Sequence, residues 1–310
     1  MFLIVAATTV GLAVVGLGAT AVVVYGGLFE VGATRQHWQI SYSVLETAMR
    51  NSVKLRARDI AEPPLSDERM ALRGAACFQA KCVQCHGAPG VRQDDIGLGM
   101  QPLPGPLVDA RQHWQPRELY WLVRHGLKMT GMPAWQYRLA DAEIWELVAF
   151  MQHLPDLNAQ QYAQWQLRAA DPAGPAAAAA SCGRGDGGRT TTRAAMPASP
   201  VAAAANATPA ISAVPTTVAD VQRGRQALNQ YACTACHSIP GVTGPDAYVG
   251  PPLDRFARRG LIAGTLPNSA DNLARWLVHT QQVKPGTAMP ELGVQPQDAH
   301  DMAAYLLTLQ

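Results

Sequence analysis

Two short segments of the chain place two cysteines and a histidine in the same order. Residues 82–86 read Cys-Val-Gln-Cys-His, and residues 233–237 read Cys-Thr-Ala-Cys-His. A three-residue step between two thiols matches the two vinyl groups of one porphyrin, and the adjacent imidazole can then coordinate the iron. The pattern therefore predicts two covalently attached c-type haems. The predicted attachment and proximal residues are Cys82, Cys85, His86, Cys233, Cys236 and His237.

Other uses of paired cysteines fit these segments less well. A zinc ribbon would place its second Cys-x-x-Cys pair about 15–20 residues after the first, whereas these pairs lie some 150 residues apart. A thioredoxin-like redox pair would require a βαβ pattern, and structural disulfides would not explain the histidine after each pair. Two further cysteines, Cys77 and Cys182, have no role that the sequence assigns, and Cys182 has no evident partner.

A second matching segment follows each motif. Residues 130–133 read Thr-Gly-Met-Pro and residues 287–290 read Thr-Ala-Met-Pro, with the methionines 46 and 52 residues beyond the proximal histidines. A methionine thioether can fill the sixth position of a His-ligated haem iron, and it then leaves no open site for a substrate. We therefore predict Met132 and Met289 as the second axial ligands.

The sixth position leaves alternatives open. Met129 lies three residues before Met132 and could replace it, and His125 and His279 lie near the two methionine segments. Large aromatic side chains are expected to wall the two haem crevices and to exclude water from them. The tryptophans expected to do so are Trp114, Trp121, Trp135, Trp145 and Trp276.

Each proximal histidine also needs a group that holds its ring. A ligating histidine usually donates its other ring N–H to a backbone carbonyl or a carboxylate. Residues 250–253 read Gly-Pro-Pro-Leu and offer a rigid carbonyl turn near His237. Residues 104–107 read Pro-Gly-Pro-Leu and are a less exact counterpart in the first repeat. Ordinary loop prolines remain the alternative interpretation of both segments.

The elements that position these motifs repeat as well. Each repeat is predicted to begin with an amphipathic helix, capped by Ser66 in one case and by Thr217 in the other, and to end with a second apolar-striped helix. A helix containing Trp-Leu-Val precedes each methionine segment. Between the helices lie loops rich in Pro and Gly, without convincing alternating strands. Small, loop-rich helical domains result, and a cofactor must fill their centres.

The first 29 residues contain no charged residue. About 20 apolar residues suffice to cross a bilayer as a helix, so residues 1–29 are predicted to be a transmembrane anchor. A cleaved signal peptide is the alternative, but it would carry a shorter apolar region behind a positive start, and no Lys or Arg precedes Glu30. Residues 30–60 are predicted to be a juxtamembrane amphipathic helix, which either packs on the first domain or contacts the membrane surface or a partner.

Residues 166–217 consist largely of Ala, Pro, Gly, Ser and Thr, and too few large apolar side chains are present to offset the cost of ordering them. They are predicted to be a flexible linker between a first domain at 61–165 and a second at 218–310. The chain as a whole has 25 basic and 23 acidic residues and a formal net charge of +2. This balance offers no polycation for nucleic acid.

Taken together, the motif at 82–86 with Met132 and the motif at 233–237 with Met289 resemble the class I cytochrome c fold, twice over. The whole chain is similar to bacterial membrane-bound dihaem cytochromes c that accompany haem-copper oxidases or membrane dehydrogenases. The resemblance covers roughly residues 60–160 and 218–310, and the second repeat departs from it by an insertion at 255–268.

This resemblance implies an all-α protein with two class I cytochrome c domains in tandem after an N-terminal transmembrane helix. It also implies two covalently bound haem c groups and haem domains in the periplasm, held by a single pass through the inner (cytoplasmic) membrane. The expected function is single-electron transfer in a respiratory chain, without enzymatic activity of its own, toward a terminal oxidase. A cytochrome c subunit of a membrane dehydrogenase is the alternative, and a dihaem peroxidase is a weaker one because neither repeat lacks a methionine.

Overall fold

The computed structural model describes residues 1–33, 36–171, 182, 218–245 and 249–310. Within these ranges the chain is mostly helical, and its strands are limited to one short antiparallel pair. The predicted all-α class is therefore confirmed. The chain divides into two units, residues 1–38 and residues 39–310. The second unit contains both Cys-x-x-Cys-His segments.

The first unit consists mainly of one long apolar helix, α1 (Phe2–Tyr25). Its stretch Ile4–Tyr25 is long and apolar enough to cross a membrane. At 1.5 Å per residue, 22 residues span about 33 Å, which matches the hydrocarbon core of a bilayer. The threonine hydroxyls in this helix bond back to carbonyls one turn earlier, so their polar groups are satisfied inside the helix. These residues are Thr8, Thr9 and Thr20.

Helix α2 (Gln39–Ala57) opens the second unit and lies within residues 30–60, for which a juxtamembrane amphipathic helix was predicted. Its C-terminal half packs on α7 (Pro116–His125), with Val53 and Ala57 fully buried. The Arg50 guanidinium lies 5.2 Å above the ring of Trp114 and adds a cation–π contact. Of the roles expected for residues 30–60, packing on the first domain is therefore observed for one face of α2.

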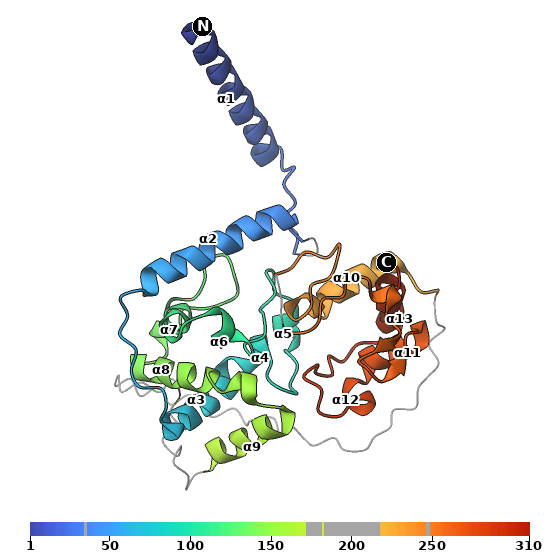
Figure 1. Cartoon of the computed structure of the whole chain (residues 1–310). Coiled ribbons are helices and arrows are strands. Elements are labelled where there is room, and N and C mark those ends of the chain that lie inside the picture. The colour runs from blue at the N-terminus through green and yellow to red at the C-terminus, as the bar shows by residue number, and fades with distance from the viewer. Residues whose placement is uncertain (34–35, 172–181, 183–217, 246–248) are drawn as a thin grey trace, which may run out of the picture. The chain divides into compact units, whose positions relative to one another are not determined.

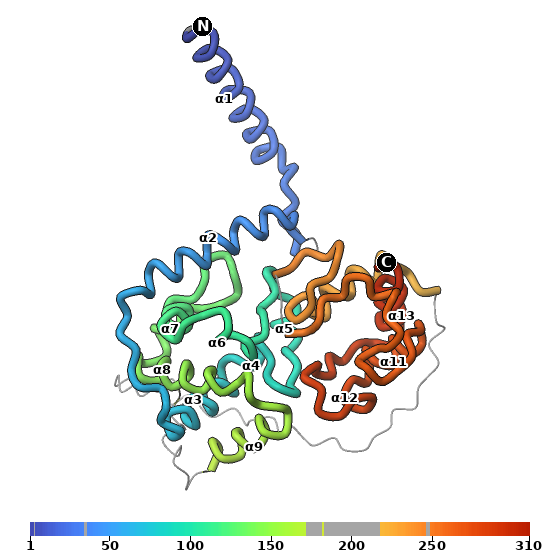
Figure 2. Tube along the Cα trace, viewed as in Figure 1, coloured from blue at the N-terminus to red at the C-terminus, as the bar shows by residue number. Residues whose placement is uncertain are grey.

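The first of the two repeated domains is built on two crossing helices, α3 (Glu68–Lys81) and α8 (Asp141–Met151) (Figures 1 and 2). Phe78 on α3 meets Phe150 on α8 edge to face, with ring centroids 5.3 Å apart. Gly74 lies at the crossing, where a Cβ would overlap the Glu146 carbonyl oxygen. The remaining short elements carry the loops around this pair. They are α4 (Val83–His86), α5 (Asp95–Leu98), α6 (Ala110–His113), η1 (Trp135–Tyr137) and η2 (Leu154–Asp156).

The second domain repeats this plan with α10 (Val221–Gln230) crossing α13 (Pro296–Leu306) and α11 (Ala270–Val278) packed on α13 (Figure 1). Gly224 is the counterpart of Gly74, because a Cβ there would overlap the Asp301 carbonyl. The insertion at 255–268 forms a short helix and the strand pair. The short elements of this domain are η4 (Cys233–Ala235), η5 (Phe256–Arg258), β1 (Leu261–Ile262), β2 (Leu266–Pro267) and α12 (Thr280–Val283).

The predicted helix caps were wrong by one to three residues. Asp67 caps α3 by accepting from the Arg69 amide, so Ser66 lies outside the helix. Asp220 caps α10 by accepting from the Arg223 amide. Thr217 lies outside the described residues. An aspartate at the cap adds a negative charge at the positive end of the helix, which favours it over the hydroxyl that precedes it.

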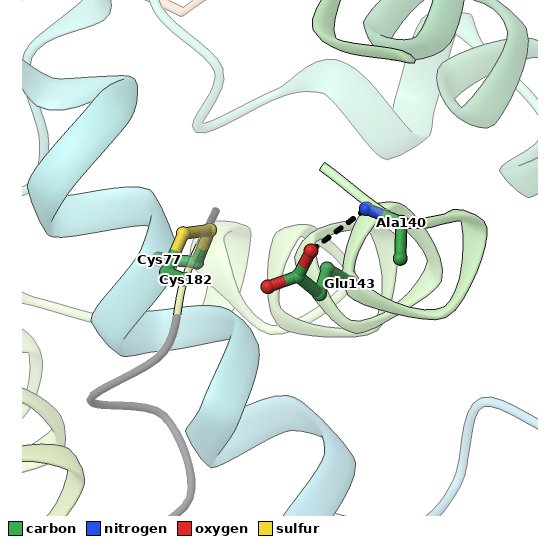
Figure 3. The surroundings of a disulfide bond; sticks show 4 residues. All are labelled: Cys77, Ala140, Glu143 and Cys182. Atoms are coloured by element: carbon green, nitrogen blue, oxygen red, sulfur yellow. Dashed lines mark hydrogen bonds between the residues drawn. A yellow bond between two sulfur atoms is a disulfide. The ribbon is translucent and has the colours of Figure 1, made fainter. Parts of the chain in front are cut away.

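The predicted boundary between residues 165 and 166 falls inside a helix, α9 (Ala159–Ala170). This helix packs on α3, and Tyr162 is buried there with its hydroxyl donating to Gln79 at 2.6 Å. Cys182 then forms a disulfide with Cys77 of α3 (Figure 3). The two cysteines left without a role by the sequence are therefore partners. The rest of the predicted linker, 172–181 and 183–217, lies outside the described residues.

The helix crossings give a first prediction. Replacing Gly224 with Ala should lower the free energy of unfolding of the second domain by about 1–3 kcal/mol, because a methyl group has no room against the Asp301 carbonyl. Hydrogen exchange of the full chain should become faster in α10 and α13 and stay unchanged in α3 and α8. Gly260→Ala is the control, since nothing lies within 4 Å of the position that its Cβ would take. Equal effects of the two substitutions would contradict the close crossing.

Candidate functional site

Each Cys-x-x-Cys-His segment folds into a single tight turn. In the first domain the amides of Cys85 and His86 both donate to the carbonyl of Cys82, at 3.1 and 2.9 Å. In the second domain the amides of Cys236 and His237 donate to the carbonyl of Cys233, at 3.2 and 2.9 Å. The turn brings the two thiols and the imidazole of each motif into one short stretch of backbone.

The imidazole of each motif is held by one backbone carbonyl. Nδ1 of His86 lies 2.6 Å from the Gly105 carbonyl oxygen, and Nδ1 of His237 lies 2.7 Å from that of Pro251. Both carbonyls belong to the Pro- and Gly-containing turns predicted for this purpose, so that prediction is confirmed. The bond fixes Nδ1 as the donor and leaves Nε2 as the free lone pair.

Burial also favours the ligating form of both rings. It lowers the pKa of His86 and of His237, while the hydrogen bond to the carbonyl opposes this shift in each case. Arg259 lowers the pKa of His237 further by charge repulsion. Both imidazoles are therefore neutral at pH 7, which is the state that can bind a metal ion.

Different side chains hold the two carbonyl turns in place. In the first domain Gln93 donates from Nε2 to the Pro104 carbonyl at 2.7 Å, one residue before Gly105. In the second domain the guanidinium of Arg259 donates to the carbonyl of Pro252, one residue after Pro251. The turn next to one histidine is thus held by a neutral amide, and the turn next to the other by a cation. No motif in the sequence marks either side chain.

The four thiols of the motifs are not paired with each other, and burial makes them weak acids. Burial is the main cause that raises the pKa of Cys82, Cys233 and Cys236 to about 12. Such thiols are protonated at pH 7, unlike the thiolates of a zinc site. Among the described residues no group of three or more Cys, His, Asp or Glu side chains could hold a metal ion. The zinc-ribbon alternative therefore has no support from this arrangement.

The backbone at Gly250 lies close to the imidazole of His237, the predicted haem ligand of the second domain. A Cβ at Gly250 would overlap the imidazole ring of His237. Glycine at this position therefore lets the ring approach the backbone of this turn closely. Two thiols, a fixed neutral imidazole and a methionine loop fit a c-type haem, which these residues would hold by two thioether bonds and one or two axial ligands.

The methionine loop of the first domain exposes its two candidate ligands, Met132 and Met129, to different degrees. Met132 is partly buried and packs on the domain core, whereas the Met129 side chain is 96% exposed on a residue with φ of 59°. Thr130 orders this loop, since its hydroxyl donates to the Leu127 carbonyl at 2.9 Å and accepts from the Met132 amide at 3.1 Å. This geometry supports Met132 over Met129 as the sixth ligand, which stays a prediction.

The methionine loop of the second domain is ordered by the side chain of Gln281, for which the sequence predicted no role. Gln281 donates from Nε2 to the carbonyls of Thr287 and Met289, at 2.9 and 2.8 Å. Its Oε1 accepts from the Gly286 amide at 3.2 Å. Met289 itself packs on the core of the domain. One side chain therefore holds the loop at three points, and no motif or spacing in the sequence marks it.

The tryptophans expected near the sites differ in their surroundings. Trp135 and Trp276 are buried, and Trp145 is partly buried and stacks on Tyr120 with centroids 4.3 Å apart. Trp121 lies 4.8 Å from the ring of His125, so that histidine belongs to an aromatic contact on α7. Trp114 takes part in the contact with α2 described above. The expected role in lining a haem crevice stays a prediction for all of them.

Comparison with known proteins matches each domain separately. Residues 69–151 match the family described as cytochrome c oxidase, cbb3-type, subunit III, and residues 221–310 match the family described as cytochrome c. The chain is also 36% identical over 89 residues to the cytochrome c oxidase subunit 2 of Alkalihalophilus pseudofirmus. That stretch is 28% of this chain and 25% of the relative, so the match covers about a quarter of the relative's length. No solved structure matches the chain.

The geometry of the methionine loops gives a second prediction. Met132→Ala should abolish the weak red-edge absorption band of sulfur-ligated ferric haem in the first domain, and Met289→Ala should abolish it in the second. Met129→Ala should leave both bands intact, because that side chain points into solvent. Loss of the first-domain band in Met129→Ala but not in Met132→Ala would show that the assignment is wrong.

The two ways of holding the carbonyl turns give a third prediction. Arg259→Gln removes a cation that acts on His237, so the oxidised iron should become easier to form and the midpoint potential of the second haem should fall. A tenfold change in the oxidised-to-reduced ratio corresponds to about 59 mV for one electron. Arg258→Gln removes the same charge from an exposed neighbouring position and is the control. Redox titration of the full chain should show a smaller change for the control.

Proposed function

Since two domains of this chain belong to the cytochrome c family, we propose that it carries single electrons between complexes of a bacterial respiratory membrane. One observation supports this most directly. Both domains repeat the same site, with a carbonyl-held imidazole in a Cys-x-x-Cys-His turn and a core-packed methionine in a side-chain-ordered loop. A pair of such sites suits transfer of electrons better than conversion of a substrate.

The ligand set explains why catalysis at the iron is disfavoured. Haem c supplies a one-electron redox centre when it is bound. His86 with Met132, or His237 with Met289, would hold the group, and the iron would then have no coordination position open to a substrate. Histidine with methionine also gives a higher potential than many other axial pairs, which suits delivery of electrons to an oxidase.

The residues around each site have distinct tasks in this mechanism. The carbonyls of Gly105 and Pro251 keep the two imidazoles in one orientation, so the ring need not turn when the charge of the site changes. Gln281 and Thr130 do the same for the two methionine loops. Both rings are partly buried, which would limit the number of water molecules that rearrange when an electron is transferred.

An oxidase is the partner that the comparisons favour. One matched family is described as a subunit of cbb3-type cytochrome c oxidase, and the matched relative is named as a cytochrome c oxidase subunit. A membrane dehydrogenase as donor fits the same two sites. A dihaem peroxidase would need one site without a methionine, whereas each domain has a methionine that packs on its core.

Two features support attachment to the inner membrane with the haem domains in the periplasm. Helix α1 has the length and composition of a single membrane span. The Cys77–Cys182 disulfide fits an oxidising compartment, since such bonds form and persist outside the cytoplasm.

The test of this proposal begins with the haems and ends with the partner. Purified full chain should contain two haems per polypeptide that resist extraction by acidified acetone, and Cys82→Ala with Cys85→Ala should remove one of them. When the reduced chain is mixed with membranes that contain a haem-copper oxidase, oxygen should oxidise both haems in a cyanide-sensitive reaction. Multiple turnovers with hydrogen peroxide and no oxidase would instead identify a peroxidase and refute the proposal.

A further inference from the structure

Helix α2 presents two faces that differ in what covers them. The residues of one face are buried or partly buried, and this face packs on α7 of the first domain. Its members follow three- and four-residue steps, as one side of a helix requires. They are Tyr42, Glu46, Met49, Val53 and Ala57. The contact with α7 accounts for the burial of Val53 and Ala57 at the C-terminal end of this face.

The opposite face of α2 carries a stripe of uncharged residues that the protein leaves exposed. It consists of Ile40, Val44, Ala48, Asn51 and Leu55. Its large apolar members are open to solvent: Ile40 is 72% exposed, Val44 63% and Leu55 59%. The stripe runs over 16 residues, from Ile40 to Leu55, and its 15 steps rise about 22 Å at 1.5 Å per residue. We call it the outer stripe of α2.

The charges of α2 are arranged around this stripe. Glu46, the acidic residue of the helix, lies on the packed face and pairs with Arg50 at 2.9 Å. Lys54 and Arg56 are exposed in the last turns and lie on either side of the outer stripe. The outward side of α2 therefore combines apolar residues with cations and carries no carboxylate.

We propose that the outer stripe of α2 lies in the headgroup region of a membrane that contains anionic lipids. An exposed helix with an apolar face and flanking Lys or Arg residues has the composition of a helix that lies in the plane of the interface. The apolar side chains enter the boundary between headgroups and acyl chains, and the cations meet the lipid phosphates. The inference rests on the proposed anchoring of the chain by α1.

The path of the chain agrees with this placement. Residues 26–38 connect α1 to α2, and such a segment can span no more than about 50 Å. Trp38, the residue before the helix, is 81% exposed, and tryptophan favours the interface between membrane and water. Binding of a protein partner or of a second copy of the chain would not require cations on both sides of the stripe. The charges therefore favour anionic lipid as the surface that covers it.

As a consequence, the first domain would be held at the membrane both by α1 and by the outer stripe of α2. With α2 packed on α7 and also seated on the bilayer, the first haem site would keep one orientation relative to the membrane plane. A membrane-embedded oxidase or dehydrogenase would then meet this domain from a defined side. The proposal is therefore about how the first domain is presented to its redox partner.

Spin labels on the full chain in vesicles can test the position of the outer stripe. The label is attached to Val44→Cys, with Val14→Cys in α1 as the lipid reference and Leu261→Cys on the exposed strand β1 as the aqueous reference. The haems are kept reduced so that they do not relax the label. Collision with oxygen reports lipid, and collision with a polar nickel complex reports water. Vesicles are made of phosphatidylcholine, with or without one-quarter phosphatidylglycerol.

We expect the Val44 label to resemble the Val14 label in anionic vesicles and to shift toward the aqueous reference without phosphatidylglycerol. The double substitution Lys54→Gln with Arg56→Gln should cause the same shift of the Val44 label in anionic vesicles. Each lost cation should lower the ratio of membrane-docked to undocked α2 by about fivefold. The proposal would be overturned if the Val44 label were as accessible to the nickel complex as the Leu261 label while the Val14 label still lay in lipid. The anchoring by α1 would then still stand. Shielding of Val44 from both reagents would overturn it in favour of a protein partner. An aqueous Val14 would refute the anchoring itself.

Discussion

The hydrogen bond from each proximal imidazole to a backbone carbonyl is the constraint on which both domains depend. A histidine that follows two closely spaced cysteines could turn its ring in several ways, and only one of these directs Nε2 at a metal. The 2.6 Å bond to Gly105 and the 2.7 Å bond to Pro251 select that orientation. The loops that carry these carbonyls have little regular structure, so other contacts must hold them. The side chains of Gln93 and Arg259 do so in the two domains.

The two domains therefore share a plan and differ in their electrostatics. A neutral amide supports the first turn, and a guanidinium supports the second, where it also stacks on Phe256 at 5.1 Å. The insertion at 255–268 supplies this guanidinium together with η5 and the strand pair. Two domains with the same Cys-x-x-Cys-His turn can thus differ in the charge next to the histidine, through the residue that supports its carbonyl turn.

The features that could be predicted from the sequence are those in which a short residue spacing fixes the local geometry. The Cys-x-x-Cys-His turns, the carbonyl turns and the crossing helices follow from spacing, because each is set by local backbone geometry. Residues that act across sequence distance could not be found in this way. Gln281 bonds to a loop six to eight residues later, and α9 returns to pack on α3, so neither leaves a periodic signal. Cys77 and Cys182 are 105 residues apart, and spacing alone cannot pair them.

The Cys77–Cys182 bond also changes the covalent distance between the two domains. Without it, the path from the first domain to the second starts at the end of α9, near Asp171. With it, residue 182 is fixed to α3, and the eleven residues from 171 to 182 no longer add to the reach of the second domain. At 3.3–3.6 Å per residue this shortens the greatest possible separation by about 35–40 Å. The disulfide thus sets an upper limit on the distance that the covalent chain allows between the first domain and residue 218.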